Sequence, residues 1–432
     1  MIVVLAAALL ALLSACASSG GGSAAGSSRG VTSNEIIIAG DGTLTTDGVP
    51  NSLAEGTNAG AQARYHLANS QGGVDGRKID YLGLADDGGS ATTLIGNMSK
   101  QILQQHAMLL APYVSEAPFP ATFVSQNQVP IFGSIIDYSM CTSQYVYGFG
   151  GCIENATYSE TTSVAALTET VMHQTTNAQG VINATKGKEY AVETTAPLAV
   201  ILPTLESAAK AIGWTVCDAD ASVPAAGATD YSTYASKMMS SCNNGKGPDG
   251  MLEILSTTSA DAQFTSTLRA LGWKGQAELA GYDPASLESP SIASALAGSV
   301  TYDDALSLPG VPLAPIFSQI TAQLKAIGQG STPISAGVLE GWIQADMAIQ
   351  ALKATGSNLS IGALQTALKN WTYPGIAGLT PPTPFPLAHS IPIPCFNVLQ
   401  VTGNQYSQLY PLSCGEVIND KTGAVDKNGF KP

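Results

Sequence analysis

The sequence of 432 residues contains few charged side chains, and positive charge is the scarcer sign. Charged residues make up 12% of the chain, with 18 Lys and Arg against 32 Asp and Glu, so the formal net charge is −14. Nucleic acids and anionic lipid headgroups attract basic surfaces. The charge balance therefore argues against nucleic-acid binding and against adhesion to anionic lipid headgroups.

Long apolar runs are missing beyond the first 13 residues, where no stretch approaches the ~18 residues that predict a membrane span. Residues 1–13 are almost entirely apolar and have the length of the hydrophobic region of a secretory signal peptide. The leader ends in Leu13-Ser14-Ala15-Cys16, which resembles a bacterial lipobox. We therefore predict a lipoprotein signal peptide over 1–16, a lipid on Cys16 and a flexible Ser/Gly/Ala-rich tether over 17–33. A plain signal peptide with an unprocessed Cys16 is the alternative.

Six cysteines follow Cys16, an even number that falls into three sequence-local pairs. Six cysteines allow about fifteen pairings, and the local scheme closes three short loops without crossing. The predicted disulfides are Cys141–Cys152, Cys217–Cys242 and Cys395–Cys414. They imply an oxidising compartment, in agreement with the leader. A metal site is the competing interpretation, although the cysteines lack close paired spacing and the four histidines are scattered.

The motifs of the common α/β enzymes are also missing. There is no Walker-type phosphate loop, no dinucleotide glycine fingerprint after the first strand, no Gly-x-Ser-x-Gly elbow and no metal-ligand helix. Two carboxylate pairs occur, Asp86-Asp87 and Asp303-Asp304, but adjacent residues at a strand end point in opposite directions. The sequence therefore favours a binding protein without a cofactor over a secreted α/β enzyme.

Short β-branched runs alternate with helical patterns along most of the chain, which predicts parallel sheets with helices on both faces. Strands are expected over 35–40, 78–85, 107–111, 129–133, 189–193, 215–218, 250–255, 277–280 and 299–302. Helices are expected over 52–71, 91–105, 118–127, 160–175, 198–212, 231–241, 260–271, 314–327, 338–355 and 361–370. The proline-dense stretch 380–394 is predicted to be a non-helical loop, and 396–402 and 405–410 a hairpin around Gly403-Asn404. Because about 400 residues exceed one core, we expect two lobes.

Five segments of the chain, in order, resemble the type 1 periplasmic solute-binding proteins, in particular the branched-chain amino acid receptor family of ABC transport. The matching segments are 31–38, 72–79, 129–132, 227–232 and 268–275. The most specific is Gly-Gly-Val-Asp-Gly-Arg-Lys-Ile at 72–79, where glycines end a helix and turn the chain. The resemblance implies two doubly wound parallel-sheet lobes joined by three hinge crossings. Lobe one would hold 34–155 and 308–394, and lobe two 156–307 and 395–432.

Binding residues are expected in the loops that follow the strands, because ligands of open α/β sheets bind beyond the carboxyl ends of the strands. By the resemblance, the loops after the third and fourth strands hold a ligand carboxylate, and an acidic group in lobe two holds an ammonium. The second of these loops has one hydroxyl fewer than the family's Ser-Ala-Thr type run. Tyr113, Tyr138 and Tyr302 are candidates for apolar walls. The full set of predicted binding residues is Ser115, Glu116, Ser134, Ile135, Tyr138, Thr194, Thr195, Tyr282 and Asp283.

The resemblance implies an extracytoplasmic, monomeric receptor anchored by its lipid to the outer face of the bacterial cytoplasmic membrane. It would capture a small polar molecule, such as an amino acid or a related small carboxylate or amide, and present it to the permease of an ABC importer. No cofactor, metal or nucleic acid is expected. A ligand sensor for a membrane signalling partner is the alternative that keeps the same fold.

Overall fold

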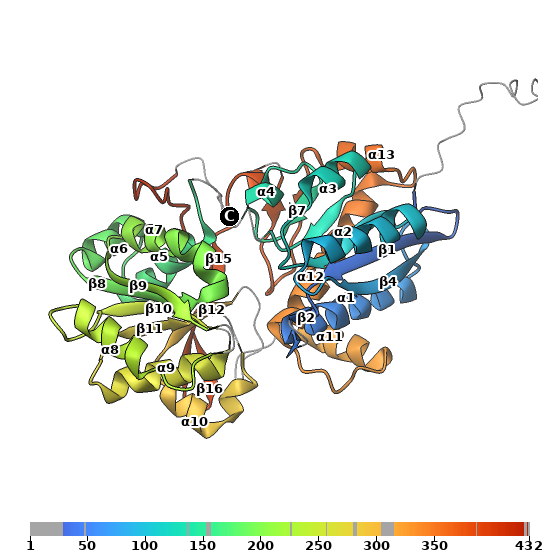
Figure 1. The fold of residues 1–432 in the computed structure, drawn as a ribbon. Helices are drawn as coiled ribbons and strands as arrows, with labels where there is room; N and C mark the ends of the chain where they lie inside the picture. The colour runs from blue at the N-terminus through green and yellow to red at the C-terminus, as the bar shows by residue number, and fades with distance from the viewer. Residues whose placement is uncertain are drawn as a thin grey trace, which may run out of the picture.

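Two lobes, each with its own β-sheet, lie side by side in the computed structural model (Figure 1). The structure describes residues 29–46, 49–135, 138–152, 157–224, 227–255, 257–279, 283–303, 315–385, 387–426 and 430. The predicted leader, Cys16, most of the tether and Tyr282 lie outside the described residues, as does the side chain of Tyr138.

The first lobe is built on a five-stranded parallel sheet in the order β4-β1-β5-β6-β7. Its strands are β1 (Glu35–Gly42), β4 (Lys78–Asp86), β5 (Leu109–Val114), β6 (Ile131–Gly133) and β7 (Val146–Gly148). Successive side chains of a strand point to opposite faces. Accordingly, Ile36 and Ile38 of β1 belong to one hydrophobic cluster, whereas Ile37 and Ala39 belong to another. Both faces of this sheet are therefore covered, as a parallel sheet requires.

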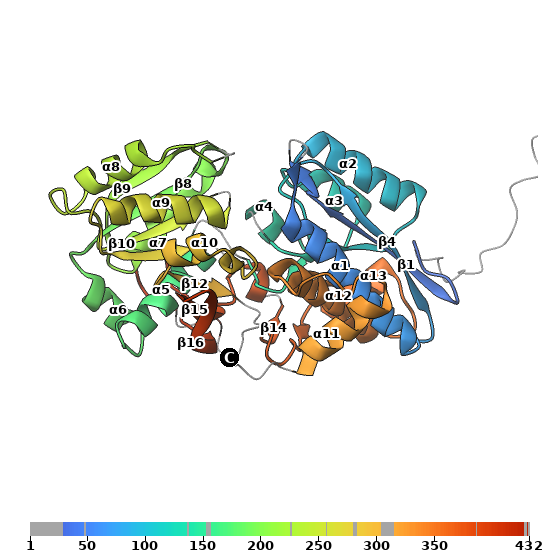
Figure 2. The same ribbon diagram turned by 90° about the horizontal axis from the view of Figure 1, so that it is seen from below.

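Helices cover the two faces of the first sheet unequally (Figures 1 and 2). One face packs against α1 (Ser52–Ser70), α11 (Pro315–Ala326), α12 (Ala336–Thr355) and α13 (Ile361–Leu368). The other packs against α2 (Ala91–Ser99), the π-helical turn η1 (Lys100–Gln104), α3 (Ala121–Asn127) and α4 (Tyr138–Cys141). The three helices α11 to α13 therefore return to the first lobe from the far end of the sequence.

The second lobe is built on a seven-stranded sheet in the order β16-β15-β12-β11-β10-β8-β9. Its strands are β8 (Glu189–Thr195), β9 (Thr215–Val223), β10 (Gly250–Ile254), β11 (Gln276–Leu279), β12 (Val300–Asp303), β15 (Cys395–Thr402) and β16 (Gln405–Cys414). The pairs among β8 to β12 are parallel, and β15 and β16 add two antiparallel strands at one edge. The hairpin predicted near the carboxyl end of the chain is this β15–β16 pair.

Helices also cover both faces of the second sheet (Figure 1). One cluster contains α5 (Glu160–Met172), α6 (Ala178–Thr185) and α7 (Leu202–Ala211), which follows the 3₁₀ turn η2 (Ala196–Ile201). The opposite cluster contains α8 (Ser232–Ser241) and α9 (Thr258–Ala270). The short elements η3 (Ser286–Glu288) and α10 (Pro290–Ala295) pack near β11, β15 and β16. The predicted α/β class with helices on both sheet faces is thus confirmed.

The chain passes between the lobes three times: after β7, after β12 and before β15. The first and third of these passages lie side by side. The Cys152 amide donates to the Ile391 carbonyl at 3.0 Å, and the Ile393 amide donates to the Gly150 carbonyl at 2.8 Å. These backbone hydrogen bonds join two of the connecting segments into a short ribbon between the lobes.

All three predicted disulfides, Cys141–Cys152, Cys217–Cys242 and Cys395–Cys414, are present. The first closes a loop beside the ribbon between the lobes, and the third closes the base of the β15–β16 hairpin. Among the described residues no helix is both long enough and apolar enough to cross a membrane.

Some elements differ from the sequence-based expectation. The strand predicted over 107–111 runs from Leu109 to Val114, and the helix predicted from 118 begins at Ala121, after Pro118 and Pro120. The prediction that 380–394 holds no helix is wrong for one 3₁₀ turn, η4 (Leu387–His389), which contains no proline. Several short elements had not been predicted because they span few residues. They include α4, α6, α10, β7, the β2 (Thr45–Thr46) and β3 (Val49–Pro50) pair, and the β13 (Thr372–Tyr373) and β14 (Thr383–Pro384) pair.

Candidate functional site

A cavity of about 1080 Å³ lies between the two lobes, and residues from both lobes and from the connecting segments line it. Lobe one contributes the amino-terminal turns of α1 and α12 together with Ser134 and Ile135. Lobe two contributes the amino-terminal turn of α9 and the loop from Asp283 to Ser286. Since small-molecule sites occupy roughly 300–1,000 Å³, this cavity has room for a small ligand and for closure of the lobes around it.

Three capped helix amino termini face the cavity. The side chain of Asn51 accepts hydrogen bonds from the amides of Leu53 and Ala54 at the start of α1, at 3.1 and 3.3 Å. Ser335 caps α12 and Thr257 caps α9 in the same manner. Polar residues that cap helices thus supply much of the polar lining, and the partial positive charge of each helix end is directed toward the cavity.

Four carboxylates line the cavity: Glu55 and Glu340 on lobe one, and Asp261 and Asp283 on lobe two. No Lys, Arg or His occurs among the described residues of the lining. Asp261 is only 5% exposed, and its Oδ1 accepts a hydrogen bond from the Leu255 amide at 3.2 Å. Burial and, to a smaller extent, the neighbouring Asp283 raise the pKa of the Asp261 carboxyl to about 8.

Apolar side chains complete the lining near the connecting segments. Tyr302 and Phe396 pack edge to face, with their ring centroids 5.7 Å apart. Other apolar lining residues are Ile135, Phe149, Leu255, Ile334 and Ile393. The cavity therefore combines an acidic, hydroxyl-rich part with an apolar part that suits the carbon skeleton of a small ligand.

The structure places three of the predicted binding residues, Ser134, Ile135 and Asp283, in the lining of the cavity. The Ser134 hydroxyl donates to Oε2 of Glu340 at 3.3 Å and accepts from Nε2 of Gln344 at 3.4 Å. The Asp283 carboxylate accepts from the hydroxyls of Thr258 and Ser286. Tyr302, a predicted apolar wall residue, also lines the cavity.

The structure places four other predicted binding residues outside the lining. Ser115 is 1% exposed, and its hydroxyl accepts from the Ala117 amide. Thr194 donates to the Ile254 carbonyl on the neighbouring strand, and Thr195 is buried at the end of β8. Glu116 accepts from Nδ2 of Asn51 at 3.1 Å and so holds a lining residue instead of lining the cavity itself. Tyr113, a predicted wall residue, is also buried away from the cavity.

Sequence reasoning missed the helix amino termini, which supply Asn51, Glu55, Thr257, Asp261, Ser335 and Glu340. A capping residue followed by an acidic residue in the first turn was a usable signal at Asn51 and Glu55, and at Thr257 and Asp261. The third helix, α12, follows another helix instead of a strand. The expectation that binding residues lie in loops after strands therefore could not identify it.

A buried acidic group lies on β1 of lobe one, outside the cavity lining. Asp41 is fully buried, and neither of its carboxylate oxygens accepts a hydrogen bond from the part of the chain that the structure describes. Burial, together with the carboxylate of Asp87, raises the pKa of Asp41 to about 9. The native state therefore binds a proton between pH ~4 and ~9 that the unfolded chain has released, so this group makes stability fall as the pH rises through that range.

We predict that Asp41→Asn stabilises the protein, because the neutral amide needs no proton. The gain in the free energy of unfolding should be on the order of 2 kcal/mol at pH 8 and smaller at pH 5. Urea denaturation at the two pH values measures it, with the exposed Asp80→Asn as a control that should change neither value. An equal gain at both pH values would show that ionisation of Asp41 is not the cause.

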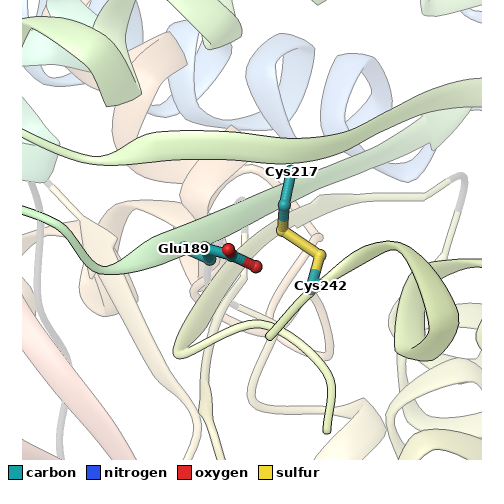
Figure 3. Close-up of side chains that lie close together, drawn as sticks. All are labelled: Glu189, Cys217 and Cys242. Carbon is teal, nitrogen blue, oxygen red and sulfur yellow. A yellow bond between two sulfur atoms is a disulfide. The ribbon is translucent and has the colours of Figure 1, made fainter. Parts of the chain in front are cut away.

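One further cluster holds chemically reactive atoms at a distance from the cavity. Figure 3 shows Glu189 beside the Cys217–Cys242 disulfide, with the potential ligand atoms within 4.8 Å of one another. Both sulfurs are committed to the disulfide, so neither is a thiolate that a metal could bind. The Glu189 carboxylate instead accepts a hydrogen bond from the Asn243 amide, next to Cys242. In the oxidised protein these residues hold a turn in place.

A protein with two α/β lobes, three connections and a polar cavity between the lobes belongs to the class of two-lobed binding proteins. More specifically, the chain belongs to the periplasmic binding protein family, whose sequence profile matches residues 42–405. This match confirms the family expected from the sequence, and it implies an extracytoplasmic location. No curated protein matches the sequence significantly.

Solved structures of similar fold come from several bacteria. The fatty acid ABC transporter substrate-binding protein from Thermomonospora curvata has a TM-score of 0.65 at 16% identity, covering 89% of this chain and 94% of that one. The isoleucine complex of a branched-chain amino acid transporter substrate-binding protein from Streptococcus pneumoniae has a TM-score of 0.63 at 14% identity, covering 89% and 100%. The benzoate complex of a solute-binding protein from R. palustris has a TM-score of 0.62 at 15% identity, covering 89% and 99%. These similarities confirm the type 1 periplasmic binding protein fold.

Proposed function

We propose that this protein captures a small polar molecule, such as an amino acid or a related small carboxylate or amide, and presents it to the permease of an ABC importer. The observation that carries the proposal is the cavity between the lobes, whose lining combines polar groups from both lobes. A ligand that contacts Ser134 and Glu340 on one side and Asp283 on the other would bridge the lobes. Such bridging favours a closed form, which the permease can distinguish from the open one.

We propose that the lipid on Cys16 and the tether keep a monomeric receptor at the outer face of the cytoplasmic membrane. Lobe one would comprise 34–155 and 308–394, and lobe two 156–307 and 395–432. The assignment of α11 to α13 to the first lobe and of β15 and β16 to the second sheet supports this division. Labelling with radioactive palmitate, and its loss in Cys16→Ala, would test the anchor.

Binding can be tested by calorimetry with small-molecule panels on protein freed of co-purified ligand by reversible unfolding. Mass spectrometry of the released ligand identifies the compound, and small-angle scattering should show a smaller radius of gyration in its presence. We further propose that the ligand is released chemically unchanged, as expected of a receptor and not of an enzyme. Turnover of the bound compound, or binding without any compaction, would contradict the proposed function.

We predict that Ser134→Ala combined with Tyr282→Ala weakens binding at least roughly tenfold, because we expect one hydroxyl from each lobe to contact the ligand. The melting temperature should change by less than about 2 °C, since Ser134 belongs to none of the hydrophobic clusters among the described residues and Tyr282 is predicted to lie in a loop that follows a strand. The matched control is Ser70→Ala with Tyr410→Ala, two exposed residues outside the cavity lining. Equal affinity of the two double variants would show that the site is misplaced.

A further inference from the structure

The charge distribution of the cavity restricts its ligand more narrowly than the family does. We propose that the cleft selects small molecules with a net positive charge, namely amines that carry more ammonium groups than carboxylates. This inference rests on the proposed binding function. A diamine and a basic amino acid are two sources of this chemistry.

The described lining holds four carboxylates and no basic side chain, although the chain has 18 Lys and Arg and four His. The short segments between residues 47 and 386 that lie outside the described residues contain no Lys, Arg or His in their sequence. An anionic ligand group would therefore meet hydroxyls and backbone amides but no side-chain cation. An ammonium group would meet several carboxylates.

The carboxylates lie on both walls. Glu55 and Glu340 belong to lobe one, whereas Asp261 and Asp283 belong to lobe two. Like charges on facing walls repel, so closure of the empty cleft costs electrostatic energy at low salt. A cation between the walls replaces this repulsion by attraction to both lobes. Net positive charge on the ligand would thus favour binding and closure together.

A buried row of acids stands behind the lobe-two wall. Asp220, Glu193 and Glu253 lie in register on the adjacent strands β9, β8 and β10. Glu193 and Glu253 are fully buried, and within the described residues neither oxygen of Glu193 has a hydrogen-bond partner. Two cations face this row from the covering helices: Lys237 of α8 pairs with Asp218 and Asp220, and Arg269 of α9 interacts with Glu253.

Asp261 connects this row to the cavity. It interacts with Glu253 on β10 and with Asp283 on the wall, and only its Oδ1 accepts a hydrogen bond among the described residues. Burial raises the pKa of Glu193, Glu253 and Asp261, and neighbouring carboxylates add to each rise. Lys237 and Arg269 offset only part of the rise for Glu193 and Glu253. A bound ammonium group would supply the missing charge and would lower the pKa of Asp261. Binding of a cation near pH 7 should therefore release a proton.

The helix amino termini do not offset this preference. The first amides of α1, α9 and α12 are already engaged by Asn51, Thr257 and Ser335. In addition, α1 and α9 each carry an acidic residue in the first turn, Glu55 and Asp261. The positive ends of these helices are thus matched by groups of the protein itself, which leaves less attraction for an anionic ligand.

The test uses calorimetry on the ligand-free full chain with four probes: 1,4-diaminobutane, arginine, isoleucine and benzoate. We expect the two cationic probes to bind at least roughly tenfold more tightly than isoleucine, and benzoate not to bind. The tighter binding of either 1,4-diaminobutane or arginine shows whether the ligand is a diamine or a basic amino acid. Titrations at pH 7 in buffers of different ionisation enthalpy should show proton release with the cations.

Variants that remove a charge from the lining test whether that charge, and not mutation in general, determines cation affinity. Glu340→Gln and Glu55→Gln should each weaken cation binding roughly tenfold. The loss for isoleucine should be smaller, because its carboxylate offsets the charge of its ammonium group. The exposed Asp80→Asn, outside the cavity lining, should change neither affinity. Tighter binding of isoleucine or benzoate, or no binding of either cation, would overturn the inference. In that case binding and compaction with the co-purified ligand would still uphold the proposed function, and their absence would refute that function too.

Discussion

Replacing Asp346 by alanine should lower the free energy of unfolding by ~3–5 kcal/mol, because it leaves a buried guanidinium without its counter-charge. Asp346 on α12 and Arg64 on α1 are 6% and 7% exposed. Both Nε and Nη2 of Arg64 donate to Oδ1 of Asp346, at 2.9 and 2.7 Å. The Tyr373 hydroxyl donates to Oδ2 at 3.0 Å. The carboxylate therefore joins three elements of lobe one.

Chemical denaturation followed by circular dichroism measures this effect. A double variant, Arg64→Met with Asp346→Leu, should recover most of the lost stability, since it removes both charges and fills the volume. Tyr373→Phe should cost only about 1 kcal/mol, the value of a single hydrogen bond. A loss below ~1 kcal/mol in Asp346→Ala would mean that water reaches Arg64 and that the pair is not effectively buried.

Replacing Gly341 by leucine should destabilise lobe one by more than ~4 kcal/mol, because it forces two helices apart. A Cβ atom on Gly341 of α12 would lie 1.9 Å from the Thr57 carbonyl oxygen of α1. Gly60 of α1 approaches the Val338 carbonyl in the same way, at 2.0 Å, and Gly337 approaches that of Leu53 at 2.2 Å. The two helices thus touch through their backbones, and no side chain fits between them.

The matched control is Gly96→Ala in α2, a helical glycine whose added Cβ would meet no atom within 4 Å. It should stabilise the protein by ~0.5–1 kcal/mol, because alanine loses less backbone entropy in a helix than glycine does. If Gly341→Leu matches this gain, the helices are not in backbone contact. Any folded Gly341 variant should also bind ligand more weakly, since α1 and α12 carry Asn51, Glu55, Ser335 and Glu340 to the cavity.

The two helix–helix contacts connect stability to the site. The amino-terminal turns of α1 and α12 line the cavity, while Arg64 and Asp346 join the same helices further along. The relative position of Glu55 and Glu340 therefore depends on packing between segments almost 300 residues apart. We expect substitutions at this helix pair to alter affinity without touching the ligand.

Local sequence signals were sufficient for much of the fold. The apolar run at 35–40 became a strand because both of its faces are buried, and the glycine turn at 72–79 separates α1 from β4 as predicted. The cysteine spacing also indicated the correct pairs, since each disulfide closes a short loop. These features depend on neighbours close in the chain or on a regular hydrophobic period, so the residues themselves carry the information.

The predicted binding residues at strand ends form two groups, one in the lining of the cavity and one outside it. Ser134 and Asp283 follow strands, and the general rule for open α/β sheets placed both at the cavity. Ser115 and Thr194 follow the same rule but lie outside the lining, because each forms a hydrogen bond within its own lobe. Whether a hydroxyl at a strand end faces a ligand or a neighbouring backbone group depends on tertiary contacts.

The sequence by itself determined the α/β class, the two lobes, the disulfides and the scarcity of positive charge. Only the tertiary structure decided which acids share a cavity. Glu55, Asp261, Asp283 and Glu340 are scattered over nearly 300 positions, and backbone contact between α1 and α12, together with the chain passages between the lobes, brings them around one space. The physical reason is that side-chain packing is a long-range property, whereas hydrophobic period, turn residues and composition are local.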